Sequence, residues 1–309
     1  MPIADSADSH ALDAVVVGGS AFGRLHVREL LQGGIRRLGI VGRSAESAAA
    51  TAAALGATHK SDIRALADLD AALAARPRIV TVCTPPQTHL AFLDVLAAHP
   101  AYVFCEKPMF WDPRLSPDDA QARAKALFER FDGRLLVNHL NTLFGDKLRL
   151  AGHAPRQRFA MRFRAARAGD IREFAADVMP HAASVLIALL GAGSAARIDA
   201  RFSKTGFEAA FDWNGCACTV AFARADAPSA MEIACDARVW TRVQTPRADG
   251  SMDVSLTSPG LAALVVPNPL RHRFARFLDA SDGGTRFDGA AAEACAVVRA
   301  SYELLKAAP

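Results

Sequence analysis

Short, continuous apolar runs alternate with Ala- and Leu-rich stretches of helical length over the first 140 residues of this 309-residue chain. This alternation predicts strands at 12–18, 38–41, 78–83, 102–105 and 135–139. Helices are expected between them, at about 22–33, 44–55, 62–75, 88–98 and 117–130. Because the runs are apolar at every position rather than at every second one, both faces of these strands should be buried. The pattern therefore predicts an α/β fold with a doubly wound parallel sheet.

The pattern changes after about residue 142, where most apolar segments look like strands and one, Pro180 to Leu190, looks like a helix. Strands are expected at 157–164, 197–202, 207–213, 216–223, 232–244 and 252–257, and closing helices at about 269–279 and 288–306. Asn214-Gly215 and Asp249-Gly250 lie between expected strands and are typical of hairpin turns. We therefore expect two domains, residues 1–141 and 142–309, the second an α+β domain with a large open, mostly antiparallel sheet.

Composition excludes several classes of protein. With 51% hydrophobic and 22% charged residues, the chain can bury a core, and disorder is excluded. The net charge is only +4 and the arginines are scattered, so we expect no nucleic-acid partner. The longest strongly apolar stretch, 182–193, has 12 residues. A bilayer span needs roughly 20, so we expect no transmembrane helix and no membrane partner.

The N-terminal segment and the cysteines give two further expectations. The segment MPIADSADSHALD carries three aspartates and no basic cluster, which fits neither a secretory signal nor a transit peptide. We therefore expect a cytoplasmic protein. The six cysteines include no C-x2-C pair and suggest no disulfide framework. We expect buried reduced thiols and no metal site.

A glycine-rich turn follows the first expected strand. Gly18-Gly19-Ser20-Ala21-Phe22-Gly23 is a degraded G-x-G-x-x-G motif in which Ser20 replaces the second glycine. In a dinucleotide site, this turn lets the backbone approach a pyrophosphate, which then lies at a helix N-terminus. The candidate cofactor contacts in this turn are Gly18, Ser20, Ala21, Phe22 and Gly23. The alternative is a glycine-rich turn that only tightens the corner between strand and helix.

The end of the second expected strand favours one dinucleotide over the other. A site for NAD carries an acid about 20 residues after the glycine-rich turn, whereas this chain reads Val41-Gly42-Arg43-Ser44 and has no carboxylate before Glu46. Arg43 and Ser44 are therefore candidates to bind a 2′-phosphate, which favours NADP(H) while NAD(H) remains possible. Ser44 can also cap the next helix, which would leave Arg43 available.

Two more strand ends carry motifs. The first reads Thr84-Pro85 with His89 four residues further on, and the second reads Cys105-Glu106-Lys107-Pro108. Together with His26, three residues after the last glycine of the turn, these motifs resemble the glucose-fructose oxidoreductase / inositol dehydrogenase (Gfo/Idh/MocA) family. The resemblance extends over nearly the whole chain, and Cys105 to Pro108 is its most specific part. It implies an N-terminal Rossmann domain.

The resemblance also implies roles for these residues. Thr84, Pro85 and His89 match the loop and helix start beneath the cofactor. Glu106, Lys107 and Pro108 match the element beside the nicotinamide, where the proline commonly follows a cis bond and the lysine contacts a substrate hydroxyl. The alternative for Glu106 and Lys107 is an ion pair on the surface of a turn.

The second half contains a further match to the family, a D-x-x-x-H segment at Asp177 and His181. Four residues apart on a helix, the two side chains share a face, and a carboxylate beside an imidazole suits proton transfer. This chain departs from the family at Pro180, where glycine is usual. Because proline is tolerated in the first helical turn, we expect Asp177 to be the helix N-cap. The alternative is a capping aspartate and a structural histidine.

His139 and Asn141 leave the last parallel strand and are candidate substrate contacts, or residues that only cap the strand end. Here many relatives carry an Arg-Phe pair that this chain lacks. Residues 271–276 form the one local basic cluster of the sequence, which suits either an anionic substrate group or a solvated or interdomain helix face.

The combined expectation is an NAD(P)-dependent oxidoreductase that transfers a hydride between the cofactor and a carbinol or ketone carbon of a sugar, nucleotide sugar or cyclitol. His181 would move the proton, Asp177 would orient the His181 imidazole, and Lys107 would polarise the substrate oxygen. Alternatives are reduction of a non-sugar substrate such as an imine, and a dinucleotide-sensing regulator without turnover. Residues 216–222 are small or apolar at both alternating sets of positions, so we also expect a homodimer or homotetramer.

Overall fold

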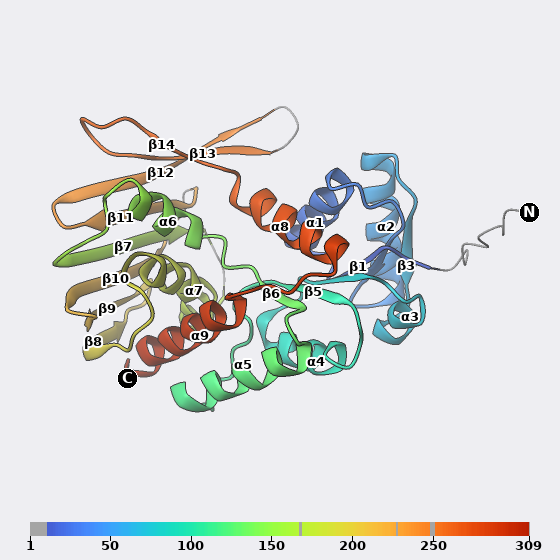
Figure 1. Cartoon of the computed structure of the whole chain (residues 1–309), viewed down its shortest axis with the longest axis horizontal. Coiled ribbons are helices and arrows are strands. Elements are labelled where there is room, and N and C mark those ends of the chain that lie inside the picture. Colours follow the sequence, from blue (N-terminus) through green and yellow to red (C-terminus); the bar gives the residue numbers. More distant parts are fainter. Residues whose placement is uncertain (1–10, 167–168, 227, 248–250, 309) are drawn as a thin grey trace, which may run out of the picture. The chain divides into compact units, whose positions relative to one another are not determined.

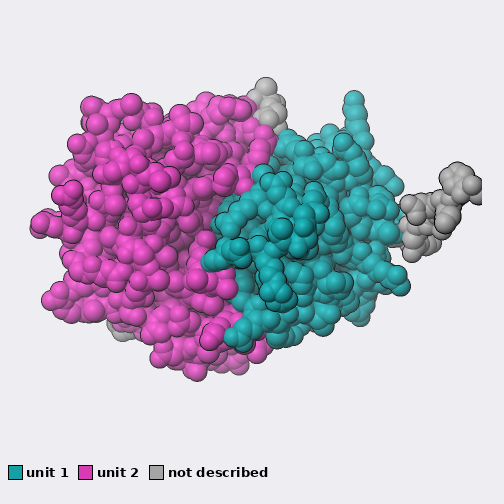
Figure 2. Space-filling view, in the orientation of Figure 1, with its two compact units in different colours: residues 1–110, 127–138, 273–290 teal, residues 111–126, 139–272, 291–309 magenta. Residues whose placement is uncertain are grey.

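The computed structural model describes residues 11–166, 169–226, 228–247 and 251–308. The chain forms two compact units, which Figure 2 shows in different colours. Unit 1 consists of Met1–Phe110, Leu127–Asn138 and Arg273–Ala290, and unit 2 of Trp111–Ala126, His139–His272 and Ala291–Pro309. The sequence predicts one boundary, after residue 141, whereas the structure divides the chain after residues 110, 126, 138, 272 and 290. Each unit is therefore assembled from three separate stretches of chain.

Unit 1 contains a six-stranded parallel sheet with the order β3-β2-β1-β4-β5-β6 (Figure 1). Its strands are β1 (Ala14–Val17), β2 (Leu38–Val41), β3 (Ile63–Leu66), β4 (Ile79–Val82), β5 (Tyr102–Cys105) and β6 (Leu135–Val137). β1, β2 and β4 are buried at every position, as strands covered on both faces should be. The strand order reverses between β1 and β4, and sheets of this type bind ligands beside the carboxyl ends of such strands. The predicted α/β class is confirmed.

The helices of unit 1 confirm the sequence analysis except at one place. They are α1 (Ala21–Gln32), α2 (Ala45–His59), α3 (Leu69–Ala74), α4 (Pro86–Leu96) and the last parts of α5 (Pro117–Phe131) and α8 (Pro269–Gly283). The helix expected over 62–75 is wrong, because its first part is the edge strand β3. α3 begins only after Asp68, whose carboxylate accepts a hydrogen bond from the backbone N–H of Ala71 at 2.8 Å. An aspartate in this position is a strong N-cap and sets the start of the helix.

Unit 2 contains an eight-stranded sheet with the order β14-β13-β12-β11-β7-β10-β9-β8 (Figure 1). Its strands are β7 (Arg158–Ala165), β8 (Ala196–Phe202), β9 (Gly206–Trp213), β10 (Cys216–Arg224), β11 (Ala230–Cys235), β12 (Arg238–Pro246), β13 (Met252–Thr257) and β14 (Leu264–Val266). β7 and β10 pair in parallel, and the other neighbouring strands pair antiparallel. The predicted large, mostly antiparallel sheet is confirmed, and β14 is a strand that the sequence analysis did not expect.

Two turns show how local residues set this sheet. Asn214 and Gly215 join β9 to β10 with φ values of 49° and 81°, as expected for a hairpin of this type. The single strand expected over 232–244 is wrong, because the chain turns at Asp236, which has a φ of 54°. The Asp236 carboxylate accepts hydrogen bonds from three successive backbone N–H groups, those of residues 156–158, and this holds the turn in place. The turn expected at Asp249-Gly250 lies outside the described residues.

Unit 2 also contains α6 (Thr142–Leu150), α7 (Ile171–Leu190) and nearly all of α9 (Ala290–Lys306). α7 begins much earlier than expected, because the Asp170 carboxylate caps it by accepting hydrogen bonds from the N–H groups of Arg172 at 2.6 Å and Glu173 at 3.3 Å. The N-cap role expected for Asp177 is therefore wrong. Pro180 lies inside the helix and removes one of its backbone hydrogen bonds.

α7 compensates for this proline by burial. Most of its apolar side chains, from Phe174 to Leu189, belong to the hydrophobic core of unit 2. Among the described residues, one helix, α7, is long and apolar enough to cross a membrane. Its most apolar window is 67% buried inside the protein. Such burial is typical of a core helix.

The two faces of the sheet in unit 2 differ in character. On β10, Cys216, Cys218, Val220 and Phe222 are buried in the core of the unit. The alternate positions carry Ala217, Thr219, Ala221 and Ala223, which are partly or fully exposed. The exposed face of β10 is therefore lined by small side chains rather than by charged ones, and the expectation of an oligomer rests on this feature.

Candidate active site

The glycine-rich turn connects β1 to α1 and needs glycine at both ends. Gly18 has a φ of 109°, and a Cβ there would lie 2.8 Å from the Cys83 carbonyl. A Cβ on Gly23 would lie 1.8 Å from the Gly18 carbonyl oxygen, so only glycine lets the helix approach the strand this closely. The predicted motif therefore makes the tight turn and the close helix packing that a dinucleotide-binding turn requires.

Ser20 is the N-cap residue of α1, but its side chain makes no capping hydrogen bond. The first N–H groups of a helix have no acceptor within the helix, and Ser20, Ala21 and Phe22 are exposed. A pyrophosphate placed there would accept hydrogen bonds from these N–H groups and interact favourably with the helix dipole. The residues present therefore fit a dinucleotide.

Arg43 and Ser44 follow β2, the strand beside β1. Ser44 caps α2 in a reciprocal arrangement, since its side chain accepts from the N–H of Ser47 at 3.3 Å and the Ser47 hydroxyl accepts from the N–H of Ser44 at 3.0 Å. Arg43 is exposed and forms no ion pair with a carboxylate in the described part of the chain. A hydrogen bond from Ser44 lowers the pKa of Glu46, the first acid after the strand. Ser44 therefore caps α2 while the Arg43 side chain stays exposed.

His89 joins the loops that follow β4 and β5. Its ring is buried, with Nε2 at 2.7 Å from the Thr84 carbonyl oxygen and Nδ1 at 2.8 Å from that of Pro108. Burial lowers the pKa of His89, although the two carbonyl oxygens favour the protonated ring. His89 therefore holds Thr84 and Pro108 in position through buried hydrogen bonds rather than through an exposed face.

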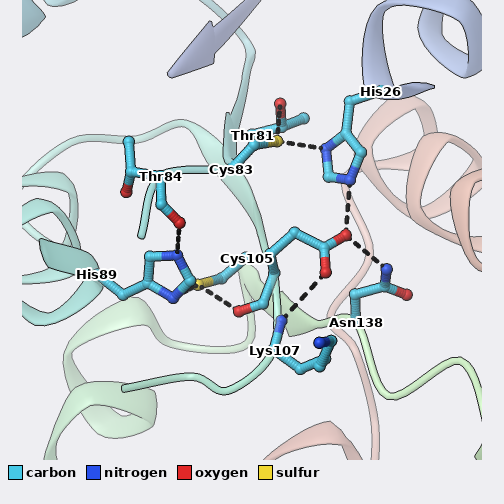
Figure 3. Close-up of polar contacts among 9 residues, drawn as sticks. His26, Thr81, Cys83, Thr84, His89, Cys105, Lys107 and Asn138 are labelled. Carbon is cyan, nitrogen blue, oxygen red and sulfur yellow. Dashed lines mark hydrogen bonds and ion pairs between the residues drawn. The ribbon is translucent and has the colours of Figure 1, made fainter. Parts of the chain in front are cut away.

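Glu106 is the centre of a buried polar network, and Figure 3 labels its partners His26, Lys107 and Asn138. Its Oε1 accepts hydrogen bonds from His26 Nε2 at 2.8 Å and from Asn138 Nδ2 at 2.7 Å, and its Oε2 accepts one from the backbone N–H of Lys107 at 3.3 Å. Burial alone raises the pKa of Glu106, but these hydrogen bonds and the nearby charge of Lys107 lower it more, so that the pKa lies below its ordinary value. Glu106 is therefore a buried carboxylate anion.

Cys83 contacts the second ring nitrogen of His26. Its Sγ lies 2.9 Å from His26 Nδ1, and burial, together with the charge of Glu106, raises the pKa of the thiol well above its ordinary value. The thiol therefore keeps its proton, and it shares a hydrogen bond with Nδ1 while Nε2 faces the Glu106 carboxylate. His26, which is fully buried, thus holds Glu106 as a hydrogen-bond donor.

Lys107 is 7% exposed and Glu106 is 5% exposed, so the alternative of a surface ion pair is excluded. The Lys107–Pro108 bond is cis, as the family resemblance implies. Lys107 Nζ lies 5.9 Å from the ring centre of Phe22, which belongs to the glycine-rich turn. Unit 1 therefore brings the end of the predicted cofactor turn and the predicted catalytic lysine together.

Asn138 and the structural role of His26 were missed by the sequence analysis. Asn138 directly follows β6 and is fully buried, and its Oδ1 has no hydrogen-bond partner among the described residues. One available signal was its position, because polar residues at the carboxyl ends of neighbouring parallel strands meet at one edge of the sheet. Nothing in the residue types alone separates Asn138 from its neighbours His139 and Asn141.

Asp177 and His181 lie on α7 in unit 2, four residues and about one turn apart, as predicted. Both side chains are partly exposed. The His181 ring lies 5.8 Å from the ring of Phe163 on β7. The pair therefore lies on the helix-covered side of the sheet, where Phe163 is buried.

His139 and Asn141 precede α6 in unit 2 and are both buried. His139 Nδ1 lies 3.3 Å from Glu293 Oε1 on α9, which also accepts a hydrogen bond from Thr142. Asn141 occupies the N-cap position of α6 without a capping bond from its side chain. Its Nδ2 lies 3.7 Å from the sulfur of Met231, and its Oδ1 has no partner in the described part of the chain.

The basic cluster of α8 does not act as a single charged face. Arg273 is buried and donates a hydrogen bond to the Val137 carbonyl at the end of β6 at 2.6 Å, and Arg276 donates one to the Asp288 carbonyl at 3.2 Å. The described residues contain no group of three or more His, Cys, Asp or Glu side chains placed to hold a metal ion.

Comparison with known proteins identifies the fold of the chain and the family of its Rossmann region. Residues 12–139 match the model of the oxidoreductase family Gfo/Idh/MocA, described as an NAD-binding Rossmann fold. No curated protein matches the sequence. A solved structure of UDP-N-acetylglucosamine 3-dehydrogenase from Acidithiobacillus ferrooxidans is 22% identical, with a TM-score of 0.72 over 96% of this chain and 97% of that one.

Two further solved structures share the fold. A 3-ketoreductase from Actinomadura kijaniata, in complex with NADP and TDP-benzene, is 17% identical, with a TM-score of 0.73 over 96% of this chain and 98% of that one. A putative myo-inositol dehydrogenase from Sinorhizobium meliloti is 16% identical, with a TM-score of 0.69 over 94% and 95%. The match over the Rossmann region carries the assignment: residues 12–139 of this chain are an NAD-binding Rossmann domain of the oxidoreductase family Gfo/Idh/MocA.

Proposed function

We propose that this protein is an NAD(P)-dependent dehydrogenase or reductase that prefers NADP(H) and acts on a carbinol or ketone carbon of a sugar, nucleotide sugar or cyclitol. The observation that carries the proposal is the buried Glu106 anion, which is fixed by His26 and Asn138 and bonded to the backbone of Lys107. A buried carboxylate is costly unless several donors satisfy it. Such a network is well suited to hold a lysine in one position beside the glycine-rich turn.

Each candidate residue has a role in this reaction. When bound, the cofactor supplies hydride exchange with the substrate carbon. The Lys107 ammonium would interact with the substrate oxygen, which stabilises the alkoxide character that develops there. His181 would accept the hydroxyl proton during oxidation and return it during reduction, and Asp177 would orient the imidazole. These catalytic roles are proposed for each residue by itself, with Lys107 in unit 1 and Asp177 and His181 in unit 2.

The preference for NADP(H) is supported by the end of β2. Arg43 is exposed and Ser44 presents a helix N-terminus, so a 2′-phosphate would find both a guanidinium and backbone N–H donors there. Glu46 follows within the same helix turn, and its hydrogen bond with Ser44 keeps it a carboxylate of low pKa. An acid after this strand serves NAD(H), so NAD(H) is the second cofactor that we consider.

The substrate class is supported by the relatives. Two of the similar structures are described as acting on a nucleotide sugar or as binding a nucleotide-linked ligand, and a third as a putative cyclitol dehydrogenase. We also propose that the exposed small-residue face of β10 pairs with a second copy of the chain, which gives a homodimer or homotetramer.

The proposal is tested by screening a metabolite library for changes in NADPH fluorescence and then comparing His181→Ala with the wild type on the substrate found. Removal of a positioned proton donor and acceptor should lower kcat by about 10²- to 10⁴-fold, while NADPH affinity changes little. Turnover of His181→Ala at the wild-type rate would make the histidine structural. A wild type that binds dinucleotide but turns over nothing would instead indicate a cofactor-sensing regulator.

A further inference from the structure

Arg242 is a half-buried arginine on the helix-facing side of the sheet in unit 2. On β12 it shares this side with the fully buried Trp240, because residues two apart on a strand point the same way. It pairs with the buried Leu256 of β13, and the register of β11 against β12 places the buried Met231 on its other side. Arg242 is therefore a cation within a row of buried apolar side chains.

This row leads from Arg242 to two of the candidate site residues. Met231 pairs with Phe163 on β7, and its sulfur lies 3.7 Å from Asn141 Nδ2. The Phe163 ring lies 6.0 Å from Arg242 Cζ and 5.8 Å from the His181 ring. The guanidinium carbon is therefore within about 12 Å of the His181 imidazole centre. Arg242, Asn141 and His181 lie around the same two apolar side chains.

No acid among the described residues balances the charge of Arg242. In the described part of the chain its hydrogen bonds go to Ser229, from Nη2 to the hydroxyl at 2.8 Å and to the carbonyl at 3.5 Å. Burial lowers the pKa of Arg242, with no neighbouring carboxylate to offset the effect. Other arginines of unit 2 have such partners, for example Arg201 with Glu208 at 2.9 Å. A half-buried guanidinium costs free energy unless an anion or several acceptors compensate it.

We propose that Arg242 binds an anionic oxygen group of the substrate, a phosphate ester or a carboxylate, while the carbinol carbon lies at His181. The planar guanidinium carries five N–H donors and binds both kinds of group through paired hydrogen bonds. Phe163 would lie beneath the substrate between its two ends, with the fully buried Met231 behind it. This inference rests on the proposed function and deepens it, because it makes the substrate an anionic polyol.

The test measures binding to the protein saturated with NADPH, so that the phosphate sites of the cofactor are already filled. Isothermal titration calorimetry with glucose 1-phosphate, glucuronate and glucose separates a phosphate, a carboxylate and a neutral probe. Wild type should bind at least one anionic probe about 10-fold more tightly than glucose. Arg242→Met should lose this difference, because it removes a charge-assisted contact, and Arg242→Lys, which keeps the charge but not the paired donors, should fall between them.

Arg238→Met is the matched control. Arg238 lies on the same strand and the same side, but it is exposed and four residues away, which corresponds to about 13 Å along the strand. It should keep the preference for the anionic probe.

Three outcomes would overturn the inference: anion binding unchanged in Arg242→Met, an equal loss in Arg238→Met, or a wild type that binds neither anion better than glucose. Failure of the wild type to bind NADPH would instead count against the proposed function. In that case, a selective loss of anion affinity in Arg242→Met would still support the subsite.

Discussion

Asn138→Asp is the substitution that most directly tests the Glu106 network. It keeps the size of the side chain but replaces the amide donor, which lies 2.7 Å from Glu106 Oε1, with a carboxylate oxygen. Both groups are buried, so water cannot screen the two charges. The variant should respond by binding one proton between the two carboxylates, as closely spaced acids do.

The magnitude follows from the lost hydrogen bond. A hydrogen bond to a charged group contributes about 1.5 to 3 kcal/mol, which corresponds to a pKa shift of roughly 1 to 2 units. The folded pKa of the new carboxyl pair is therefore raised above the unfolded values of about 4. A raised folded pKa gives stability that is present at low pH and lost as the pH rises through that pKa. The free energy of unfolding should thus be close to that of the wild type near pH 4.5 and lower by about 2 kcal/mol near pH 8.

Urea unfolding followed by two probes measures this effect. The three tryptophans of the chain, Trp111, Trp213 and Trp240, all lie in unit 2, so their fluorescence reports on that unit. Far-UV circular dichroism reports on both units and includes the transition of unit 1. The substitution should shift the dichroism transition more than the fluorescence transition, and only at the higher pH.

Two results would refute this reasoning. A deficit of the same size at both pH values would mean that only shape or packing was changed, and the absence of any deficit at pH 8 would mean that Asn138 does not hold a charged Glu106. Glu106→Gln provides the control. With the carboxylate already removed, adding Asn138→Asp should no longer give a deficit that grows with pH.

Two further predictions concern the cofactor and the oligomer. Arg43→Ala should weaken NADPH binding by about 10- to 150-fold, the equivalent of 1.5 to 3 kcal/mol. The NADH affinity of the same variant, measured by calorimetry, should be nearly unchanged. Tighter binding of NADH than of NADPH by the wild type would contradict this prediction. Ala221→Arg places a long charged side chain on the exposed face of β10 and should reduce the mass measured by light scattering to that of the 32.8 kDa monomer. A wild type that is already a monomer at micromolar concentration would remove the basis for the proposed interface.

Much of unit 1 could be predicted because continuous apolar runs and glycine-rich turns are local signals. β2 and β5 have the predicted bounds, and the first glycine of the turn has the positive φ that its position suggests. The prediction failed at 62–75, where the edge strand β3 buries little and carries no strong apolar run. Its identity as a strand comes from pairing with β2, which a local pattern does not contain.

The error at α7 has a similar cause. Pro180 suggests a helix start, but the capping bonds of Asp170 and the burial of the apolar face determine where the helix begins. The local sequence contains the unfavourable proline but not the tertiary contacts that compensate for it.

The candidate site was predictable where motifs carry it and not where pairing across the fold creates it. Lys107 and His181 belong to motifs, so their positions could be named from the sequence. Asn138 becomes part of the site only because β5 and β6 are neighbours, and Arg242 only because four strands align Leu256, Met231 and Phe163 with it. Neither alignment leaves a signature within a short stretch of sequence.

The return of the chain to unit 1 at residues 273–290 has a consequence during protein synthesis. The rings of Phe274 and Phe277 lie 4.4 Å and 5.2 Å from that of Phe104, and Arg273 donates to the Val137 carbonyl. The ribosome therefore makes nearly all of unit 2 before the residues that complete the core of unit 1. Until then, the nascent parallel sheet exposes Phe104, and exposed apolar surface of this kind is what chaperones bind and what leads incomplete chains to aggregate.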